Sequence, residues 1–433
     1  MEILVIKIFA IFFSFVFITN CSFNSNSRIW NDQKNEIVQN KNIVEIFDTK
    51  EVITKEFNPG ISIDFSDTSS QNYKYNNFGS YDYKGGLDKI QGYRFSNFKS
   101  LDGLNSMPLF LNDGLVYFDK KGTLLRFDQS SKIIWKNNFY SKAEKKLNPI
   151  LSLALDKNNL LIVDNISKIY SVNLNTGELN WSKNNPYPFN SQIKIHNESF
   201  FAIDYNNTLR CFKIVDGSEC WSLATESSFT ISNTDYSLVI IDNQVIFNNS
   251  IGDITAVDIS SGLIIWQLPT QSSNIINQTY NFKISNLVSD GKSIFFSNNR
   301  NEFYSVDIKT GSLNWKNDIS SNLTPIILDE FIITISEDGY LFIIQKDQGN
   351  ILRINDVYSS YKPKHRKDIK PEGFLIASNK IFLTNNNGHL IVVNLKTGKI
   401  EQIKKIAREK ISKPYIFNQN LYLVKNGTII KYD

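Results

Sequence analysis

Apolar and polar residues repeat in a three-strand pattern along most of the chain, beginning near residue 110. Each clear copy contains an apolar strand, a short polar turn, a second strand in which apolar and polar residues alternate, a turn that ends in Gly, and a third strand that ends in Trp. A period of two is typical of β-strands and argues against a solenoid of helices. The clear copies are Leu160 to Trp181, Phe200 to Trp221, Val245 to Trp266 and Ile294 to Trp315.

Weaker copies flank the clear ones and raise the total to eight, with the last one truncated. The first weak copy has the pair Ser130-Ser131 in place of the Gly turn. Two later copies lack the Trp, and we expect Leu352 and Gln402 at its place. The weaker copies are Leu115 to Trp135, Phe331 to Leu352, Ile381 to Gln402 and Leu421 to Asp433.

The turn glycines recur at intervals of 38 to 49 residues, which is typical of a β-propeller with four short strands in each blade. Glycine suits a tight turn because it adopts a positive φ at little cost. We therefore predict an all-β protein, an eight-bladed β-propeller of four-stranded antiparallel blades, or seven blades if the first copy is not a blade. The glycines are Gly177, Gly217, Gly262, Gly311, Gly349 and Gly398.

The Trp that ends the third strand of a copy is expected to pack against the neighbouring blade. One blade cannot bury its own faces, so stacking around a ring must create the core. The residues predicted for this docking motif are Trp135, Trp181, Trp221, Trp266 and Trp315.

The truncated last copy requires a strand from elsewhere in the chain. The chain stops just after the strand 428–432, so the last blade lacks its outer strand. Gly92 to Phe98 alternates suitably, and we predict that this N-terminal segment closes the ring and removes its exposed edges. The propeller is accordingly assigned to residues 89–433.

The first 88 residues read as a targeting signal followed by a tether. Ile8 to Ile18 is an uncharged apolar run of signal-peptide length, too short for a typical membrane span. Its end, Ile18-Thr19-Asn20-Cys21, resembles a bacterial lipobox, in which the Cys receives the lipid. We predict a lipoprotein signal peptide over 1–20, lipid attachment at Cys21, and a flexible tether and extension over 21–88. An ordinary cleaved signal and a membrane span remain alternatives.

Composition agrees with a strand-rich protein that does not bind nucleic acid. Phe and Tyr, which favour strands, number 31 and 19, whereas Met numbers 2. The 47 basic and 43 acidic residues give a net charge of +4, too small a surplus for a general nucleic-acid footprint. The three histidines have no metal-ligand spacing, and no catalytic motif occurs. No metal, cofactor or catalytic residue is predicted.

Two of the three cysteines, Cys211 and Cys220, flank one predicted hairpin turn. In an oxidising compartment they could form a disulfide, provided that the strand register brings them to bonding distance. Two free thiols are the alternative.

The turn sequence identifies a family resemblance. Thr176-Gly177 with Trp181, and Thr310-Gly311 with Trp315, resemble the Trp motif of quinoprotein-like propellers. Together with the lipobox and the tether, the chain resembles the BamB family of outer-membrane assembly lipoproteins, the alphaproteobacterial members in particular. The resemblance implies a non-catalytic scaffold of the outer-membrane β-barrel assembly (BAM) complex, lipid-anchored in the outer membrane and facing the periplasm.

The same resemblance implies the partners. Such proteins bind the POTRA domains of BamA and other BAM subunits, and they aid folding and insertion of outer-membrane proteins. The corresponding BamA-facing loop lies between Trp221 and Val245, where Phe229 and Ile231 match an apolar pair. The Arg expected after the pair is missing, and Asn233 follows instead. The alternative is that both apolar residues belong to the core.

Two other functions remain open from the sequence. One is a periplasmic propeller lipoprotein that binds a ligand or a peptide. The other is a pyrroloquinoline-quinone-dependent dehydrogenase, although the adjacent cysteine pair of the methanol-dehydrogenase type is missing.

Overall fold

The computed structural model describes residues 53–66, 84–85, 92–97, 108–226, 235–270, 282–425 and 428–432. All of them belong to one compact unit, Lys50–Asp433. The predicted signal peptide and Cys21 lie outside the described residues. None of the helices in these ranges has the length and apolar character that crossing a bilayer requires.

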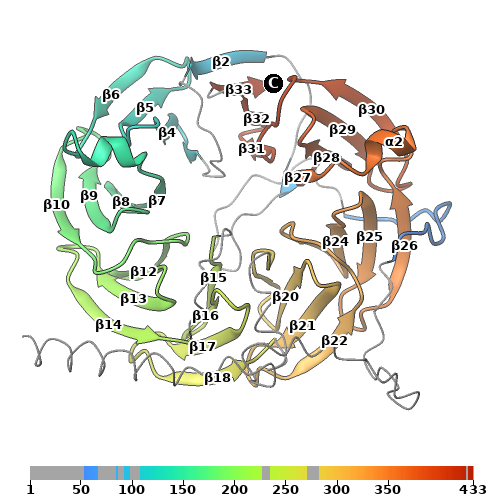
Figure 1. Ribbon diagram of the computed structural model, residues 1–433, viewed down its shortest axis with the longest axis horizontal. Helices are drawn as coiled ribbons and strands as arrows, with labels where there is room; N and C mark the ends of the chain where they lie inside the picture. Colours follow the sequence, from blue (N-terminus) through green and yellow to red (C-terminus); the bar gives the residue numbers. More distant parts are fainter. Residues whose placement is uncertain are drawn as a thin grey trace, which may run out of the picture. The chain divides into compact units, whose positions relative to one another are not determined.

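Eight β-sheets are arranged around a ring, and each sheet is one blade of a propeller (Figure 1). Blades I to VII each use four consecutive antiparallel strands, which run from the centre of the ring to its rim. The predicted all-β, eight-bladed fold is confirmed. Helix in the described part of the chain amounts to one 3-10 turn, η1 (Glu144–Leu147), and one short α-helix, α2 (Pro363–Arg366).

The first four blades follow one another directly along the chain, and their strands are given from the centre outward. Blade I consists of β3 (Leu109–Leu111), β4 (Gly114–Phe118), β5 (Leu124–Asp128) and β6 (Ile133–Asn137). Blade II consists of β7 (Leu151–Asp156), β8 (Asn159–Asp164), β9 (Lys168–Asn173) and β10 (Leu179–Asn184). Blade III consists of β11 (Lys194–His196), β12 (Ser199–Ile203), β13 (Thr208–Lys213) and β14 (Glu219–Ala224). Blade IV consists of β15 (Leu238–Ile241), β16 (Gln244–Asn248), β17 (Ile254–Asp258) and β18 (Ile264–Leu268).

The remaining blades complete the ring. Blade V consists of β19 (Val288–Ser289), β20 (Ser293–Asn298), β21 (Glu302–Asp307) and β22 (Leu313–Asn317). Blade VI consists of β23 (Ile326–Leu328), β24 (Phe331–Ile335), β25 (Tyr340–Gln345) and β26 (Ile351–Asp356). Blade VII consists of β27 (Pro371–Ala377), β28 (Lys380–Asn385), β29 (His389–Asn394) and β30 (Ile400–Lys405). Blade VIII contains β31 (Tyr415–Phe417), β32 (Asn420–Lys425) and β33 (Thr428–Tyr432).

Blade VIII takes its outer strand from the N-terminal side of the chain, as predicted. β2 (Gly92–Asn97) pairs antiparallel with β33, with Gly92 opposite Tyr432 and Asn97 opposite Thr428. The last residue of the predicted strand, Phe98, lies outside the described residues. Pairing the two ends of the propeller leaves no blade incomplete and no seam in the ring.

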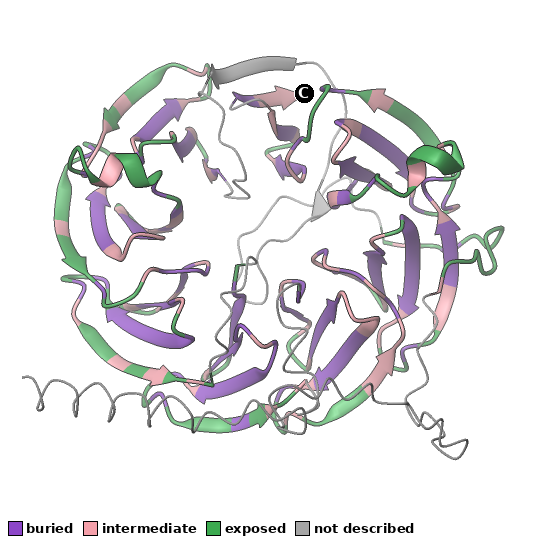
Figure 2. Ribbon diagram, viewed as in Figure 1, coloured by how far each residue is buried: buried purple, intermediate pink, exposed green. Residues whose placement is uncertain are grey.

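Burial follows the position of each strand within its blade (Figure 2). The second strands are apolar without alternation, because neighbouring blades cover both of their faces; in β8, all residues from Leu160 to Asp164 are buried. The rim strands are mostly exposed, as in β10, where no residue is buried. The core is therefore made of blade-to-blade contacts rather than of one central cluster.

The N-terminal extension contributes one further strand that the sequence did not indicate. β1 (Lys84–Gly85) pairs in parallel with β27, with Lys84 opposite Ile376, and becomes a fifth strand at the inner edge of blade VII. These residues lie in the flexible tether and extension predicted from the sequence over 21–88. A strand of two residues carries too little hydrophobic pattern to be recognised.

Candidate functional site

The strand order gives the ring two different faces. Turns from the first to the second strand, and from the third to the fourth, lie on one face, which we call the turn face. Turns from the second to the third strand lie on the other face together with the loops between blades, and we call it the loop face. Interblade loops such as 138–150, 185–193 and 225–237 are the longer connections. The loop face is therefore the candidate functional surface.

Docking of a tryptophan on the next blade joins successive blades. The Trp266 indole donates to the Ile308 carbonyl at 2.7 Å. A Cβ added to Gly311 would lie only 2.7 Å from the nearest atoms of the Trp266 ring. Gly311 has a φ of 70°, so both the backbone and the close approach require glycine. The same N–H to carbonyl contact joins Trp135 to Leu174, Trp181 to Ile214, Trp221 to Ile259 and Trp315 to Lys346.

Blade VI has an arginine in place of the docking tryptophan. The residue is Arg353, and the expectation of Leu352 was wrong, because the docking position lies four residues after the turn glycine, here Gly349. The Arg353 guanidinium donates to the Leu395 carbonyl at 2.8 Å. Leu395 lies three residues before Gly398, which is the place that each indole contacts in the other blades.

Blade VII has Gln402 at the docking position, as predicted, and this side chain is exposed. The next blade offers nothing for it to meet. In blade VIII the outer strand is β2, which comes from elsewhere in the chain, so no turn leads from the third strand to the fourth. The missing Trp is thus a consequence of how the ring closes.

Residues 53–66, which we call the strap, lie against the rim of blade VI. Phe57 forms an antiparallel bridge with Ile354 of β26, with N to O distances of 3.2 and 2.8 Å. Arg353 also donates to the Ile61 carbonyl at 3.0 Å and to the Lys396 carbonyl. Further contacts join Asn355 to the Pro59 carbonyl, Asp356 N to Glu56, Ile63 N to the Lys396 carbonyl, and Ser66 to Asp329.

Arg353→Trp is expected to release the strap and leave the blades intact. Tryptophan would restore the docking contact of the other blades, but it has no donors for the Ile61 and Lys396 carbonyls. Losing charge-assisted hydrogen bonds should raise amide exchange in residues 53–66 by at least about tenfold. Deuterium exchange read by mass spectrometry measures this, with Gln402→Trp as the matched control. Unchanged protection of the strap in Arg353→Trp would show that Arg353 does not hold it.

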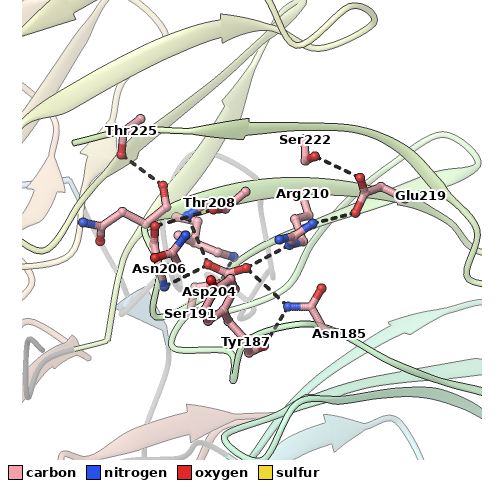
Figure 3. Close-up of polar contacts among 12 residues, drawn as sticks. Asn185, Tyr187, Ser191, Asp204, Asn206, Thr208, Arg210, Glu219, Ser222 and Thr225 are labelled. Atoms are coloured by element: carbon pink, nitrogen blue, oxygen red, sulfur yellow. Dashed lines mark hydrogen bonds and ion pairs between the residues drawn. The ribbon is translucent and has the colours of Figure 1, made fainter. Parts of the chain in front are cut away.

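A buried charged network occupies the junction of blades II and III on the loop face (Figure 3). Asp204 is fully buried, and its Oδ2 accepts from Arg210 Nε at 2.9 Å and from Asn185 Nδ2 at 3.3 Å. Arg210 also donates to Glu219 Oε2 at 2.7 Å. The other Asp204 oxygen accepts from the amides of Asn206 and Thr208. This set of partners satisfies a carboxylate that would otherwise be costly to bury.

The same turn holds the loop between blades III and IV. Asn207 donates from Nδ2 to the Glu226 carbonyl at 2.8 Å, and its own carbonyl accepts from Thr225 N at 3.1 Å. Its Oδ1 accepts from Ser250 N, on the next blade, at 3.0 Å. Beyond the loop, Tyr236 N donates to the Asn190 carbonyl at 2.7 Å. Both ends of residues 227–234 are therefore fixed to the ring.

A repeated side-chain cap on the loop face was missed in the sequence. The last residue of the second strand, or the one after it, accepts hydrogen bonds from the amides of the following turn, as Asp204 does. The sequence could have predicted this cap, because Asp, Asn or Ser recurs at this position in the copies. The capping residues are Asp119, Asp164, Asp204, Asn249, Asn298, Ser336 and Asn385.

The predicted partner-binding residues Phe229 and Ile231 lie outside the described residues, so their role stays a prediction. Cys211 and Cys220 are both thiols here, the first buried and the second exposed. A β-bulge places Cys211 opposite Trp221 instead of Cys220, and burial raises the pKa of the Cys211 thiol. The disulfide between them stays a prediction as well.

The described part of the ring contains no metal-binding cluster. Across the described ranges, no three His, Cys, Asp or Glu side chains gather in a way that could hold a metal ion. Buried acids such as Asp204 are instead used to cap turns and pair with arginine.

Comparison with known proteins gives one consistent result. A family model described as outer membrane protein assembly factor BamB matches residues 120–355, more than half of the chain. A curated BamB from Shewanella oneidensis is 23% identical over 168 residues, which span only 38% of this chain and 38% of that relative.

Solved structures show the same fold. BamB from Moraxella catarrhalis superposes with a TM-score of 0.64 at 16% identity, covering 80% of this chain and 99% of that one. A europium-containing methanol dehydrogenase gives 0.58 at 9% identity, covering 78% and 84%. Identities this low establish a shared propeller and nothing about activity.

Proposed function

Because the chain belongs to the family of outer membrane protein assembly factor BamB, we propose that it is a non-catalytic scaffold of the outer-membrane β-barrel assembly complex. In this role it binds the POTRA domains of BamA and other subunits of the complex, and it aids folding and insertion of outer-membrane proteins. Binding uses apolar loops and strand edges of a rigid ring, without chemistry on the client.

The observation that carries the proposal is that the two described ends of the loop between blades III and IV are held to the ring. Asn207 holds the chain before this loop through the Glu226 carbonyl, and Tyr236 N holds the chain after it. Ordering of both ends before binding lowers the entropy that a partner must overcome. Phe229 and Ile231, within the loop, are proposed as its apolar contacts with BamA.

We propose that the protein is anchored in the outer membrane by lipid on Cys21 and faces the periplasm. The chain between Cys21 and the strap would reach about 100 Å when extended, at ~3.4 Å per residue. The strap sets where this tether leaves the ring, at the rim of blade VI. The anchor thus allows the ring to reach a partner while it stays attached to the membrane.

Isolation of the native complex tests the scaffold role. A tagged full-length chain, expressed in its own cells and purified in mild detergent, should recover BamA in a stoichiometric amount. Recovery of the propeller alone, with BamA absent, would refute the proposal.

A catalytic role has its own test. Absorbance and dye-linked alcohol oxidation are measured after adding pyrroloquinoline quinone and calcium to the purified chain. The scaffold proposal expects no turnover above buffer, and steady turnover would favour the dehydrogenase alternative.

A further inference from the structure

The loop between blades I and II, residues 138–150, is held to the ring at both ends. Near its start, the Tyr140 hydroxyl donates to Asp164 Oδ2 at 2.5 Å, and both side chains are buried. At its end, Ile150 N donates to Asn165 Oδ1 at 2.8 Å, and Asn165 N donates to the Ile150 carbonyl at 3.2 Å. The path of the loop is thus set by the ring and not by a partner.

Local contacts order the middle of the loop as well. Ser141 N donates to Glu144 Oε2 at 2.7 Å, and Glu144 N donates to Ser141 Oγ at 3.3 Å, which starts the turn η1. Asn148, with a φ of 53°, ends it. Between these points Leu147 is 62% exposed, and Ile150 beyond them is 40% exposed. Apolar side chains held in place this way dock with little loss of conformational entropy.

The charges of the loop that form no ion pair with the described residues all have one sign. Lys142, Lys145 and Lys146 lie in the loop, and none of them forms an ion pair with the described residues. The one acid of the loop, Glu144, is paired with Lys168 at 2.7 Å. The hydrogen bond from Lys168 is the main cause that lowers the pKa of Glu144, to about 2. Glu144 is therefore neutralised by the ring, and the loop presents three cations beside two apolar side chains.

We propose that the loop 138–150 is a second docking element, which takes an acidic protein surface with an apolar pocket for Leu147. It lies on the loop face, where the two described ends of the loop proposed to contact BamA also lie. The proposal rests on the proposed function, because it assigns the acidic surface to the same partner. The three lysines of the loop orient the acidic partner and speed its association with the ring, while Leu147 supplies the apolar contact.

The test is the affinity of the full-length chain for purified BamA, both in detergent. Leu147→Asp is expected to weaken binding about tenfold, since a carboxylate would enter an apolar, acidic pocket. The triple variant K142E/K145E/K146E should weaken it at least about tenfold and flatten its salt dependence. The matched control is K362E/K364E/K367E, which reverses three exposed lysines of another interblade loop on the same face. Unchanged melting temperatures establish that the variants fold.

Each result decides between claims. If both loop variants bind BamA more weakly and the control variant binds it like the wild type, the proposal is supported. If both loop variants keep the wild-type affinity, the docking proposal is wrong and the proposed function is unaffected. Failure of the unmodified chain to bind BamA overturns both. A last result separates protein from lipid. If the loop variants bind BamA like the wild type but no longer prefer phosphatidylglycerol vesicles over phosphatidylcholine vesicles, the loop binds a lipid surface and the protein-docking proposal is wrong.

Discussion

Trp266→Ala is expected to lower the free energy of unfolding by about 3–5 kcal/mol, the range found when a large buried aromatic side chain is truncated. Trp266 is 8% exposed and joins blade IV to blade V through the Ile308 carbonyl. The cavity would open between two blades whose contact makes up much of the core. Chemical denaturation followed by circular dichroism measures the change.

Gln402→Ala is the matched control for this substitution. It truncates the residue at the same position in blade VII, but Gln402 is exposed and no turn of blade VIII lies against it. Its effect should stay within about 0.5 kcal/mol, as for ordinary surface substitutions. Equal effects of the two substitutions would show that stability does not depend on docking between blades.

Asp204→Ala is expected to destabilise the protein by about 3–5 kcal/mol, because it leaves the buried Arg210 without its main partner. Among the described residues, Arg210 keeps the partly exposed Glu219 as its acidic partner, and the amides of Asn206 and Thr208 lose their acceptor. Loosening of this turn should also free Asn207, so binding to BamA should weaken. Denaturation and affinity measurements on the same sample test both effects.

Asp216→Ala separates this network from the general effect of removing an aspartate. Asp216 lies on the turn face of the same blade, is exposed, and caps only Ser218. It should change stability little and leave BamA binding at the wild-type level. Comparable losses from Asp204→Ala and Asp216→Ala would contradict the assigned role of the buried network.

The propeller was predictable because its signals repeat. Four copies place glycine where the backbone needs a positive φ and tryptophan four residues later, as at Gly311 and Trp315. The first blade keeps this geometry without glycine, since Ser131 adopts a φ of 66°. Closure by β2 was predictable as well, because the last copy lacked one strand.

Other features depend on contacts between residues far apart in the chain. The strap contacts residues of blade VI that lie about 300 positions later in the sequence. The sequence of the sixth copy alone gives no indication that Arg353 makes this contact. The pairing of Asp204 with Arg210 and Asn185 joins two blades, and one copy of the pattern cannot specify it. The capping residues, by contrast, were visible in every copy as a polar residue at the end of the second strand.

The most direct test of the account places a photo-crosslinking amino acid on each face of the ring in living cells. Tyr187, 44% exposed in the loop between blades II and III, represents the loop face, and Phe229 is the contact with BamA proposed from the sequence. Val215, 79% exposed in the turn between β13 and β14, represents the turn face. We expect crosslinks to BamA from Tyr187 and Phe229 and none from Val215. Crosslinks to BamA from Val215, with none from Tyr187 or Phe229, would contradict it.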